Sequence, residues 1–213
     1  MNYSKLENSK DYLNFLRYQY SPKPGKIQEL ELPKRHYLTF DGKGEPKTEP
    51  FQLAIQCLYA TAYTLKMGLK FGKIEKPADY FDYKVAPLEG LWWYKDGKFR
   101  MGSDLKNILW KLVILVPAFI GKDDMETAKI HAKEKKKELA IERIAFETFE
   151  AKKVIQTMHI GPYNKEEETV KLLLDYAKEK GLKITGKHHE IYMSDPRRTP
   201  ETKLKTIIRY AVN

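Results

Sequence analysis

The segment Lys187–Asp195 contains a carboxylate and a phenol that could act together on a ligand. Its composition is typical of a strand, in which successive side chains point to opposite sides. His188, Glu190 and Tyr192 therefore share one side, with Ile191 on the other. If Ile191 packs against a layer of helices, Glu190 faces either solvent or a cavity. On a solvated strand it would be an ordinary surface residue, whereas in a cavity it could hold a cation or activate water.

Aromatic residues that could form walls around Glu190 are spread over the chain. Their rings stack on flat molecules and attract cations. The adjacent residues Trp92 and Trp93 must point to opposite sides of a strand, so only one of them is expected in the core. The candidates for the wall are Trp92, Trp93, Trp110, Tyr163 and Tyr192, and core packing is the alternative for each tryptophan.

Three further residues are weaker candidates for contact with a ligand. Tyr59 and Tyr63 lie four residues apart on one flank of a predicted helix, where they border either the core or the ligand. His159 is either a structural residue or a second polar group of the site.

The histidines give no local metal-binding pattern. His188 and His189 are neighbours on a strand and point to opposite faces, so they cannot bind one ion together. His36, His131 and His159 show no ligand spacing. We therefore predict neither a metal site nor a cofactor.

Composition limits the classes of function. The 213 residues are 42% apolar and 12% aromatic, which is enough to fill a sizeable core. The formal charge of +10 comes from lysines spread along the whole chain, with no nucleic-acid reader motif beside them, so nucleic-acid binding is not favoured. A basic surface for another partner is the alternative.

The single cysteine and the apolar runs indicate the compartment. Cys57 cannot form a disulfide within one chain, which fits a reducing environment. The longest apolar stretch, Leu112–Ile120, is too short to span a bilayer, and the N-terminus has no apolar run of the signal-peptide type. We expect a cytoplasmic protein without a membrane partner, and the sequence leaves the oligomeric state open.

The predicted elements follow one order twice. A strand, a helix and two further strands are expected at Arg35–Asp41, Pro50–Lys66, Tyr80–Tyr94 and Asn107–Val116, and again at Lys153–His159, Glu166–Lys180, Lys187–Asp195 and Lys203–Val212. Gly68-Leu69-Lys70 and Gly181-Leu182-Lys183 recur, with each glycine expected to end its helix.

The repeat predicts an α+β fold in a single domain. It divides into a lead-in segment (1–33), a first repeat (34–117), a connector helix (118–141) and a second repeat (142–213). We expect a pseudo-two-fold pair of strand-helix-strand-strand units that form an antiparallel sheet. The helices are expected on one face and a ligand cleft on the other, because clefts between modules commonly bind ligands.

Several short motifs in this order resemble the GyrI-like family. They are Tyr37–Gly44, Pro87–Trp93, the turn His159-Ile160-Gly161-Pro162-Tyr163, and His189–Tyr192 followed by a last strand. The family includes the effector-binding domains of multidrug-responsive regulators, and some stand-alone members are hydrolases of cyclopropane-containing DNA-alkylating compounds. The resemblance covers nearly the whole chain.

The resemblance implies a cleft that takes flat, lipophilic and often cationic molecules between aromatic rings, with Glu190 at its floor. As a hydrolase, the protein would use Glu190 to direct water, and Tyr163 would be the matching tyrosine of the turn. In physical terms, enclosure by aromatic rings disfavours the charged carboxylate and raises its pKa, and a bound cation reverses that effect. Glu190 therefore fits two roles, a counter-charge in a binding protein or a general base in a hydrolase.

Overall fold

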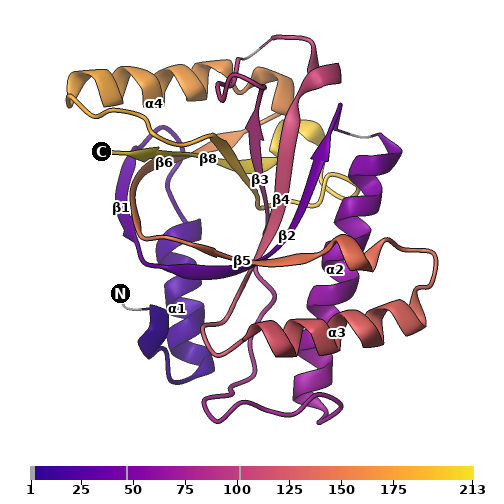
Figure 1. Ribbon diagram of the computed structural model, residues 1–213. Coiled ribbons are helices and arrows are strands. Elements are labelled where there is room, and N and C mark those ends of the chain that lie inside the picture. The colour runs from indigo at the N-terminus through magenta and orange to yellow at the C-terminus, as the bar shows by residue number, and fades with distance from the viewer. Residues whose placement is uncertain (1–2, 47, 101) are drawn as a thin grey trace.

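An eight-stranded sheet organises the computed structural model, which describes residues 3–46, 48–100 and 102–213 (Figure 1). The strand order is β1-β6-β8-β7-β3-β4-β2-β5, and all the strand pairs are antiparallel. The predicted α+β class and antiparallel sheet are therefore confirmed.

The strand-helix-strand-strand order occurs twice, as the sequence predicts. The first group is β2 (Arg35–Lys43), α2 (Glu49–Lys70), β3 (Leu88–Trp93) and β4 (Leu109–Val116). The second is β6 (Lys152–Ile160), α4 (Glu167–Glu179), β7 (His188–Tyr192) and β8 (Lys205–Val212). Before and between them lie α1 (Ser9–Tyr20), β1 (Gln28–Leu32), α3 (Lys122–Lys135) and β5 (Ala145–Phe149).

Helices α2 and α4 lie at separate places on the same face of the sheet (Figure 1). Phe51 of α2 stacks on Trp92 of β3, at 5.6 Å between ring centroids. Val170 and Leu173 of α4 pack with Ile208 of β8 in a second apolar cluster. Fully burying one such apolar side chain contributes about 1.5–3 kcal/mol. These two packings fix both helices to the strands beneath them.

Glu190 lies on this helix-covered face, and here the prediction was wrong. Gly90 and Ile208 are its partners in the neighbouring strands, and paired residues point to the same side. Glu190 therefore shares a face with Ile208, which packs under α4, and its strand β7 lies next to β3, whose Trp92 packs against α2. The ligand site must lie between the helices, because the opposite face is occupied.

The opposite face is covered by α1, which belongs to the lead-in segment. The hydroxyl of Tyr20 donates a hydrogen bond to the buried carboxylate of Glu89. His189 Nε2 lies 2.7 Å from that carboxylate, and the guanidinium of Arg209 lies 3.9 Å from it. Burial alone would raise the pKa of Glu89, but the His189 hydrogen bond and the nearby charges lower it overall. Glu89 is thus a partnered, structural carboxylate.

The outermost strands are exchanged between the two repeats. Strand β1 directly precedes β2 in the chain, yet it pairs with β6 of the second repeat. Strand β5 directly precedes β6, yet it pairs with β2 of the first repeat. The lead-in segment therefore supplies one edge of the sheet, which the sequence did not predict.

The two recurring glycines have different roles. Gly181 has a φ of +66° and ends α4, as expected. Gly68 does not end α2, which continues to Lys70, and the chain turns instead at Gly72 with a φ of +69°. This turn brings Ile74 back over Gly68, whose missing side chain leaves room for it.

One predicted strand region is shorter than expected, and the helices were also compared with the length needed to cross a bilayer. Within Tyr80–Tyr94 only β3 forms a strand, and the segment before Pro87 is irregular. Among the described residues, no helix combines the length and the apolar character that crossing a bilayer requires.

Candidate functional site

Two adjacent strands and the start of a helix place polar side chains together near the centre of the sheet. Strand β7 contributes His188, Glu190 and Tyr192, which alternate onto the same face. Strand β8 contributes Tyr210 beside His188. Glu166, the residue before α4, completes this group. We call Glu166, His188, Glu190 and Tyr192 the Glu190 cluster.

Both carboxylate oxygens of Glu190 have partners. The hydroxyl of Tyr192 donates to Oε2 over 2.8 Å, and His188 Nε2 lies 3.0 Å from Oε1. Only 13% of the Glu190 side chain is exposed, and none of the His188 side chain. Burial, followed by the charge of Glu190, raises the pKa of Tyr192. Tyr192 is therefore a protonated donor at neutral pH.

Glu166 is the most unusual member of the cluster. The residue is 1% exposed, and its Oε1 atom accepts no hydrogen bond from the described residues. Burial raises the pKa of Glu166 well above its ordinary value, and the charge of Glu190 raises it further, while the Thr206 hydroxyl offsets part of this. The cluster therefore holds two carboxyl groups of which one, Glu166, favours the protonated form.

Aromatic rings cover the cluster from two sides. Tyr163 meets Tyr192 edge to face, at 5.9 Å between ring centroids. Phe99 stacks on His188 in parallel, at 4.0 Å and an angle of 8°. Burial and the charge of Glu190 raise the pKa of Tyr163 to about 12, so its hydroxyl stays protonated at neutral pH. Both rings come from outside the strands and lie over their side chains.

Gly90 allows the neighbouring side chains to converge beside Glu190. A Cβ atom at this position would lie 2.8 Å from Trp92 Nε1 and 2.8 Å from the Tyr192 hydroxyl. Any larger residue would displace one of these groups. The glycine of β3 is therefore required by the arrangement of the site.

The three tryptophans have three different environments. Trp92 faces the Glu190 side of the sheet and is 4% exposed. Trp93 points to the opposite face, with the Lys187 ammonium over its ring, so the expectation that it lines the Glu190 site was wrong. Trp110 lies in the core against Phe51, and its indole donates to the Gly44 carbonyl. Of the three, only Trp92 contributes to the surroundings of Glu190.

The remaining predicted site residues lie near the cluster's edge or hold its scaffold. Tyr59 is half-buried on α2 and stacks with Tyr63, which is exposed. His159 donates through Nε2 to the Pro162 carbonyl at 3.2 Å, and its Nδ1 lies 2.9 Å from the Thr169 hydroxyl. His159 thus ties the turn before Tyr163 to α4, which is a structural role.

Sequence reasoning missed Glu166, His188 and Phe99 as members of the site. Glu166 precedes a charged helix start and therefore resembles a solvated residue. His188 was placed on the same strand face as Glu190, but as a potential ligand it was weighed only together with His189 and was not assigned to the site. Phe99 lies between Gly97 and Gly102 in a segment without periodicity, so no pattern pointed to it.

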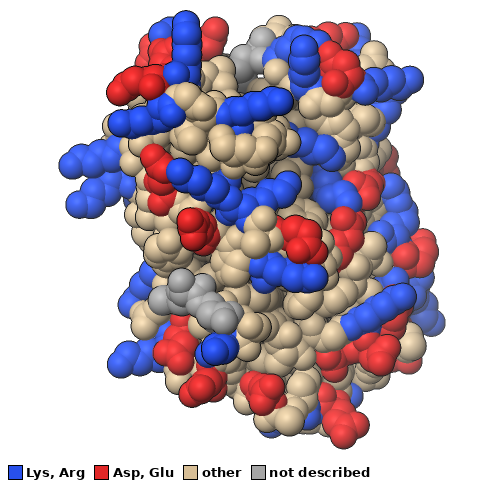
Figure 2. Space-filling view, turned by 60° about the vertical axis from the view of Figure 1, so that its left-hand side comes forward, with Lys and Arg blue, Asp and Glu red and all other residues tan. Residues whose placement is uncertain are grey.

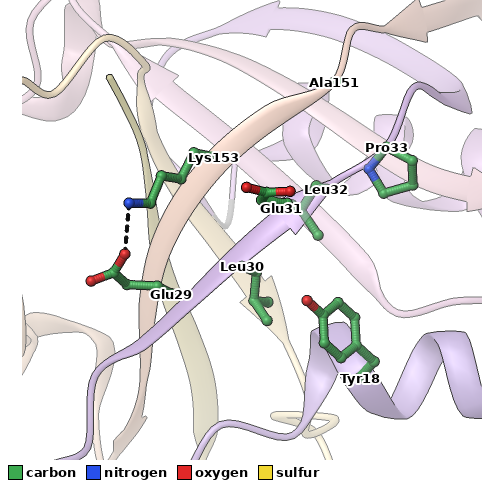
Figure 3. Close-up of a pocket in the computed structure, with 8 residues that line it drawn as sticks. All are labelled: Tyr18, Glu29, Leu30, Glu31, Leu32, Pro33, Ala151 and Lys153. Carbon is green, nitrogen blue, oxygen red and sulfur yellow. Dashed lines mark ion pairs between the residues drawn. The ribbon is translucent and has the colours of Figure 1, made fainter. Parts of the chain in front are cut away.

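A surface depression of about 580 Å³ lies elsewhere. Figure 3 shows its lining residues, which come from α1, β1 and β6 and the chain next to them. Glu29 and Lys153 form an ion pair of 2.8 Å at its rim. It is an open surface depression, whereas the Glu190 cluster has a buried carboxyl oxygen that lacks a partner among the described residues, so we take the cluster as the candidate site.

The surface charge is mixed. Figure 2 shows Lys and Arg side chains interspersed with Asp and Glu over the face drawn. On that face the positive charge does not form one continuous acid-free stripe, the arrangement that a nucleic-acid footprint requires.

The fold and the cluster define a small-molecule-binding domain of the GyrI-like class. The family model described as "GyrI-like small molecule binding domain" matches residues 119–212. A hydrolase from Listeria innocua is 36% identical, covers 95% of this chain and 98% of its own, and superimposes with a TM-score of 0.83. The chain therefore belongs to the GyrI-like family.

Two other structures place this membership in context. An uncharacterized conserved protein from Listeria innocua is 37% identical over the full length of both chains, with a TM-score of 0.82. The C-terminal domain of EcmrR is 14% identical, covers 88% of this chain and 97% of its own, and has a TM-score of 0.55, which supports the fold alone. No curated protein matches the sequence.

Proposed function

We propose that the protein binds flat, lipophilic and preferentially cationic small molecules over the Glu190 cluster. The observation that carries this proposal is the carboxylate of Glu190, which is largely buried and surrounded by aromatic side chains. A bound cation would restore the electrostatic stabilisation that burial removes from this charge. Rings on either side would add stacking and cation–π attraction.

The preference for flat molecules is supported by Phe99. Its ring is parallel to the imidazole of His188 at 4.0 Å, which is the geometry that a planar ligand would adopt. Tyr163 and Trp92 are the other aromatic groups near Glu190. In this proposal Tyr59 borders the entrance, and the cytoplasm supplies the ligand.

Fluorescence titration tests the binding proposal. A planar lipophilic cation and its uncharged analogue are titrated against wild type, Glu190→Gln and the exposed control Glu167→Gln. We expect the fluorescence of Trp92 to change on binding. Glu190→Gln should lower the affinity for the cation by about tenfold or more and leave the affinity for the neutral analogue nearly unchanged. Equal affinities of all three proteins for the cation would contradict the role of Glu190.

The competing class is a basic interaction module. A gel-shift experiment with duplex and single-stranded nucleic acid, run at two salt concentrations, separates it from the first proposal. Salt-sensitive binding of nucleic acid without any response to the dyes would favour that alternative.

A second candidate function is hydrolysis, supported by the 36% identity with a hydrolase from Listeria innocua. The family resemblance suggests that the bond opened belongs to a strained ring. The substrate would be a planar compound with a cyclopropane conjugated to a carbonyl. Glu190 would accept a proton from water while the water oxygen bonds to the ring carbon. The breaking carbon–carbon bond would deliver its electron pair to the carbonyl oxygen, which Tyr163 or Tyr192 would stabilise by donating a hydrogen bond.

The same substitution tests this chemistry. General-base assistance contributes about 10²–10⁴-fold, so Glu190→Gln should lower kcat on a cyclopropane-containing dienone by about that factor. Its affinity for the neutral substrate should change little. If wild type and variant convert the substrate equally fast, the protein is a binder and Glu190 is not the base.

A further inference from the structure

The Glu190 cluster brings together three side chains of metal-ligand type. One potential ligand atom from each of Glu166, His188 and Glu190 lies within 4.8 Å of the others. They come from two segments separated in sequence, which is why local spacing did not indicate them. We propose that these three residues form a binding site for one divalent transition-metal ion, with Zn²⁺ and Mn²⁺ as the best matches.

Glu166 is the residue that points to a ligand. Its carboxyl group is buried, and Oε1 has no hydrogen-bond partner among the described residues. Leaving such a group unsatisfied costs about 1–3 kcal/mol, so native proteins seldom retain one without a reason. A metal ion between Glu166 and Glu190 would give the Glu166 carboxylate a partner and offset the repulsion between the two carboxylates. It would also favour the ionised form of Glu166, which burial disfavours.

His188 has the second contact that a metal-binding imidazole needs. Its Nε2 faces Glu190, and its Nδ1 lies 2.8 Å from the buried hydroxyl of Tyr210. A hydroxyl can donate or accept a hydrogen bond. Tyr210 can therefore accept a hydrogen bond from Nδ1–H of His188, which leaves the lone pair of Nε2 free for a metal ion. Outer partners of this kind fix the tautomer and the orientation of metal-binding histidines.

The ligand set selects the kind of ion. Two carboxylates balance the charge of a divalent cation and suit Mn²⁺, while the imidazole nitrogen suits Zn²⁺ and disfavours Mg²⁺ and Ca²⁺, which prefer ligands made of oxygen alone. Ligand bonds of about 2.1 Å would require the three atoms to approach to roughly 3.4 Å in tetrahedral geometry. Movements of about an ångström in the side chains would achieve this.

The buried cluster on the other face shows why acidic burial alone does not indicate a metal. Glu89 already has Tyr20, His189 and Arg209 as partners, so it needs no additional cation. Arg209 would in addition repel one. The contrast with Glu166 depends on a missing partner and not on the number of acidic residues.

The metal proposal goes beyond the binding of organic molecules but shares Glu190 with it. Direct metal titration is therefore the test, because it does not depend on any organic ligand. Chelator-treated wild type is titrated with Zn²⁺ by calorimetry, and the bound zinc is measured after dialysis. We expect one zinc per chain, and in parallel a visible absorption spectrum of coordinated Co²⁺.

Variants identify the ligands. Glu166→Gln and His188→Gln are compared with Glu167→Gln, the exposed neighbour, and His131→Gln, a histidine on α3. The first two should lose zinc affinity by more than tenfold, and the two controls should keep it. Tyr210→Phe removes only the partner of Nδ1 and should weaken zinc binding by about 10–100-fold, the usual effect of an outer partner. Thermal melting confirms that each variant is folded.

Two results would overturn the proposal. One is the absence of stoichiometric zinc from wild type. The other is equal zinc affinity of Glu166→Gln and Glu167→Gln. Titration of chelator-treated wild type with the organic cation separates this failure from failure of the proposed function, because a wild type that binds the cation but no zinc contradicts the metal site alone.

Discussion

Glu89 and Glu166 are both buried glutamates, but their surroundings have opposite effects on their charge. The partners of Glu89 lower its pKa although burial acts against them. Glu166 has burial and the neighbouring Glu190 acting in the same direction, so its pKa is raised. A folded protein with both groups therefore responds to pH in two opposing ways at its centre.

Glu166 should make the protein less stable as the pH rises. Because its pKa is higher in the folded state, the stabilisation is complete below the unfolded value of about 4.3 and is lost as the pH rises toward the folded value. Each unit of difference corresponds to about 1.4 kcal/mol. Glu166→Gln, which stays neutral, should therefore gain stability over wild type at pH 8 and little at pH 4.5.

Urea unfolding at both pH values, with chelator present, measures this difference. Glu167→Gln is the control, because it removes an exposed carboxylate next to the same helix. A gap between wild type and Glu166→Gln that is the same at both pH values would show that Glu166 has no raised pKa.

At the scale of elements, the helices and strands with clear periodicity were predictable. Repeating apolar residues located α2 and α4, and alternation located β4 and β7. Strand β1 was missed because Gln28–Leu32 is short and follows a Pro-Gly interruption, and its partner is more than 100 residues away. The face that carries the site was wrongly predicted for a related reason. The local sequence pattern shows that the two faces of a strand differ in polarity. The docking of α1, which the pattern does not show, decides which face of the sheet is covered.

The end of α2 gives an element-scale prediction. Alanine favours helices over glycine by about 1 kcal/mol, so Gly68→Ala should stabilise α2 if packing is ignored. However, the new Cβ would lie 2.7 Å from Cγ1 and Cδ1 of the buried Ile74. We expect Gly68→Ala to lower the free energy of unfolding by about 1–3 kcal/mol.

A double mutant tests the cause. In an Ile74→Ala background the clash is absent, so Gly68→Ala should be neutral or stabilising by up to about 1 kcal/mol. Denaturant unfolding of the four proteins gives the coupling energy. Additive effects of the two substitutions would show that the Ile74 contact is not the reason for the glycine.

For the whole molecule, the exchanged strands β1 and β5 make the two repeats interdependent. Fragments 1–137 and 138–213 separate the chain between α3 and β5. Each fragment alone lacks the outer strand of its own repeat. We expect neither to fold alone, and the two together to form one complex with the circular dichroism spectrum of the intact protein.

The matched control is fragment 34–137, which lacks α1 and β1. It should not complement fragment 138–213, because β6 would lose its pairing with β1 and Glu89 would lose the hydrogen bond from Tyr20. Size-exclusion chromatography of the mixtures distinguishes the outcomes. Equal assembly with and without residues 1–33 would show that the exchange is unimportant for folding.

The exchange also determines how a ligand can reach the centre of the sheet. A hinge between the two repeats would have to break the ladders between β1 and β6 and between β2 and β5 at the same time. We therefore expect the sheet that carries Glu190 to stay rigid, and the two repeats not to move apart when a ligand enters. In the proposed function, a ligand would enter by movement of the segments that cover the cluster, such as the segment with Phe99 and the turn with Tyr163. In the proposed function, substitutions in these two coverings should therefore change the choice of ligand more than substitutions in the strands.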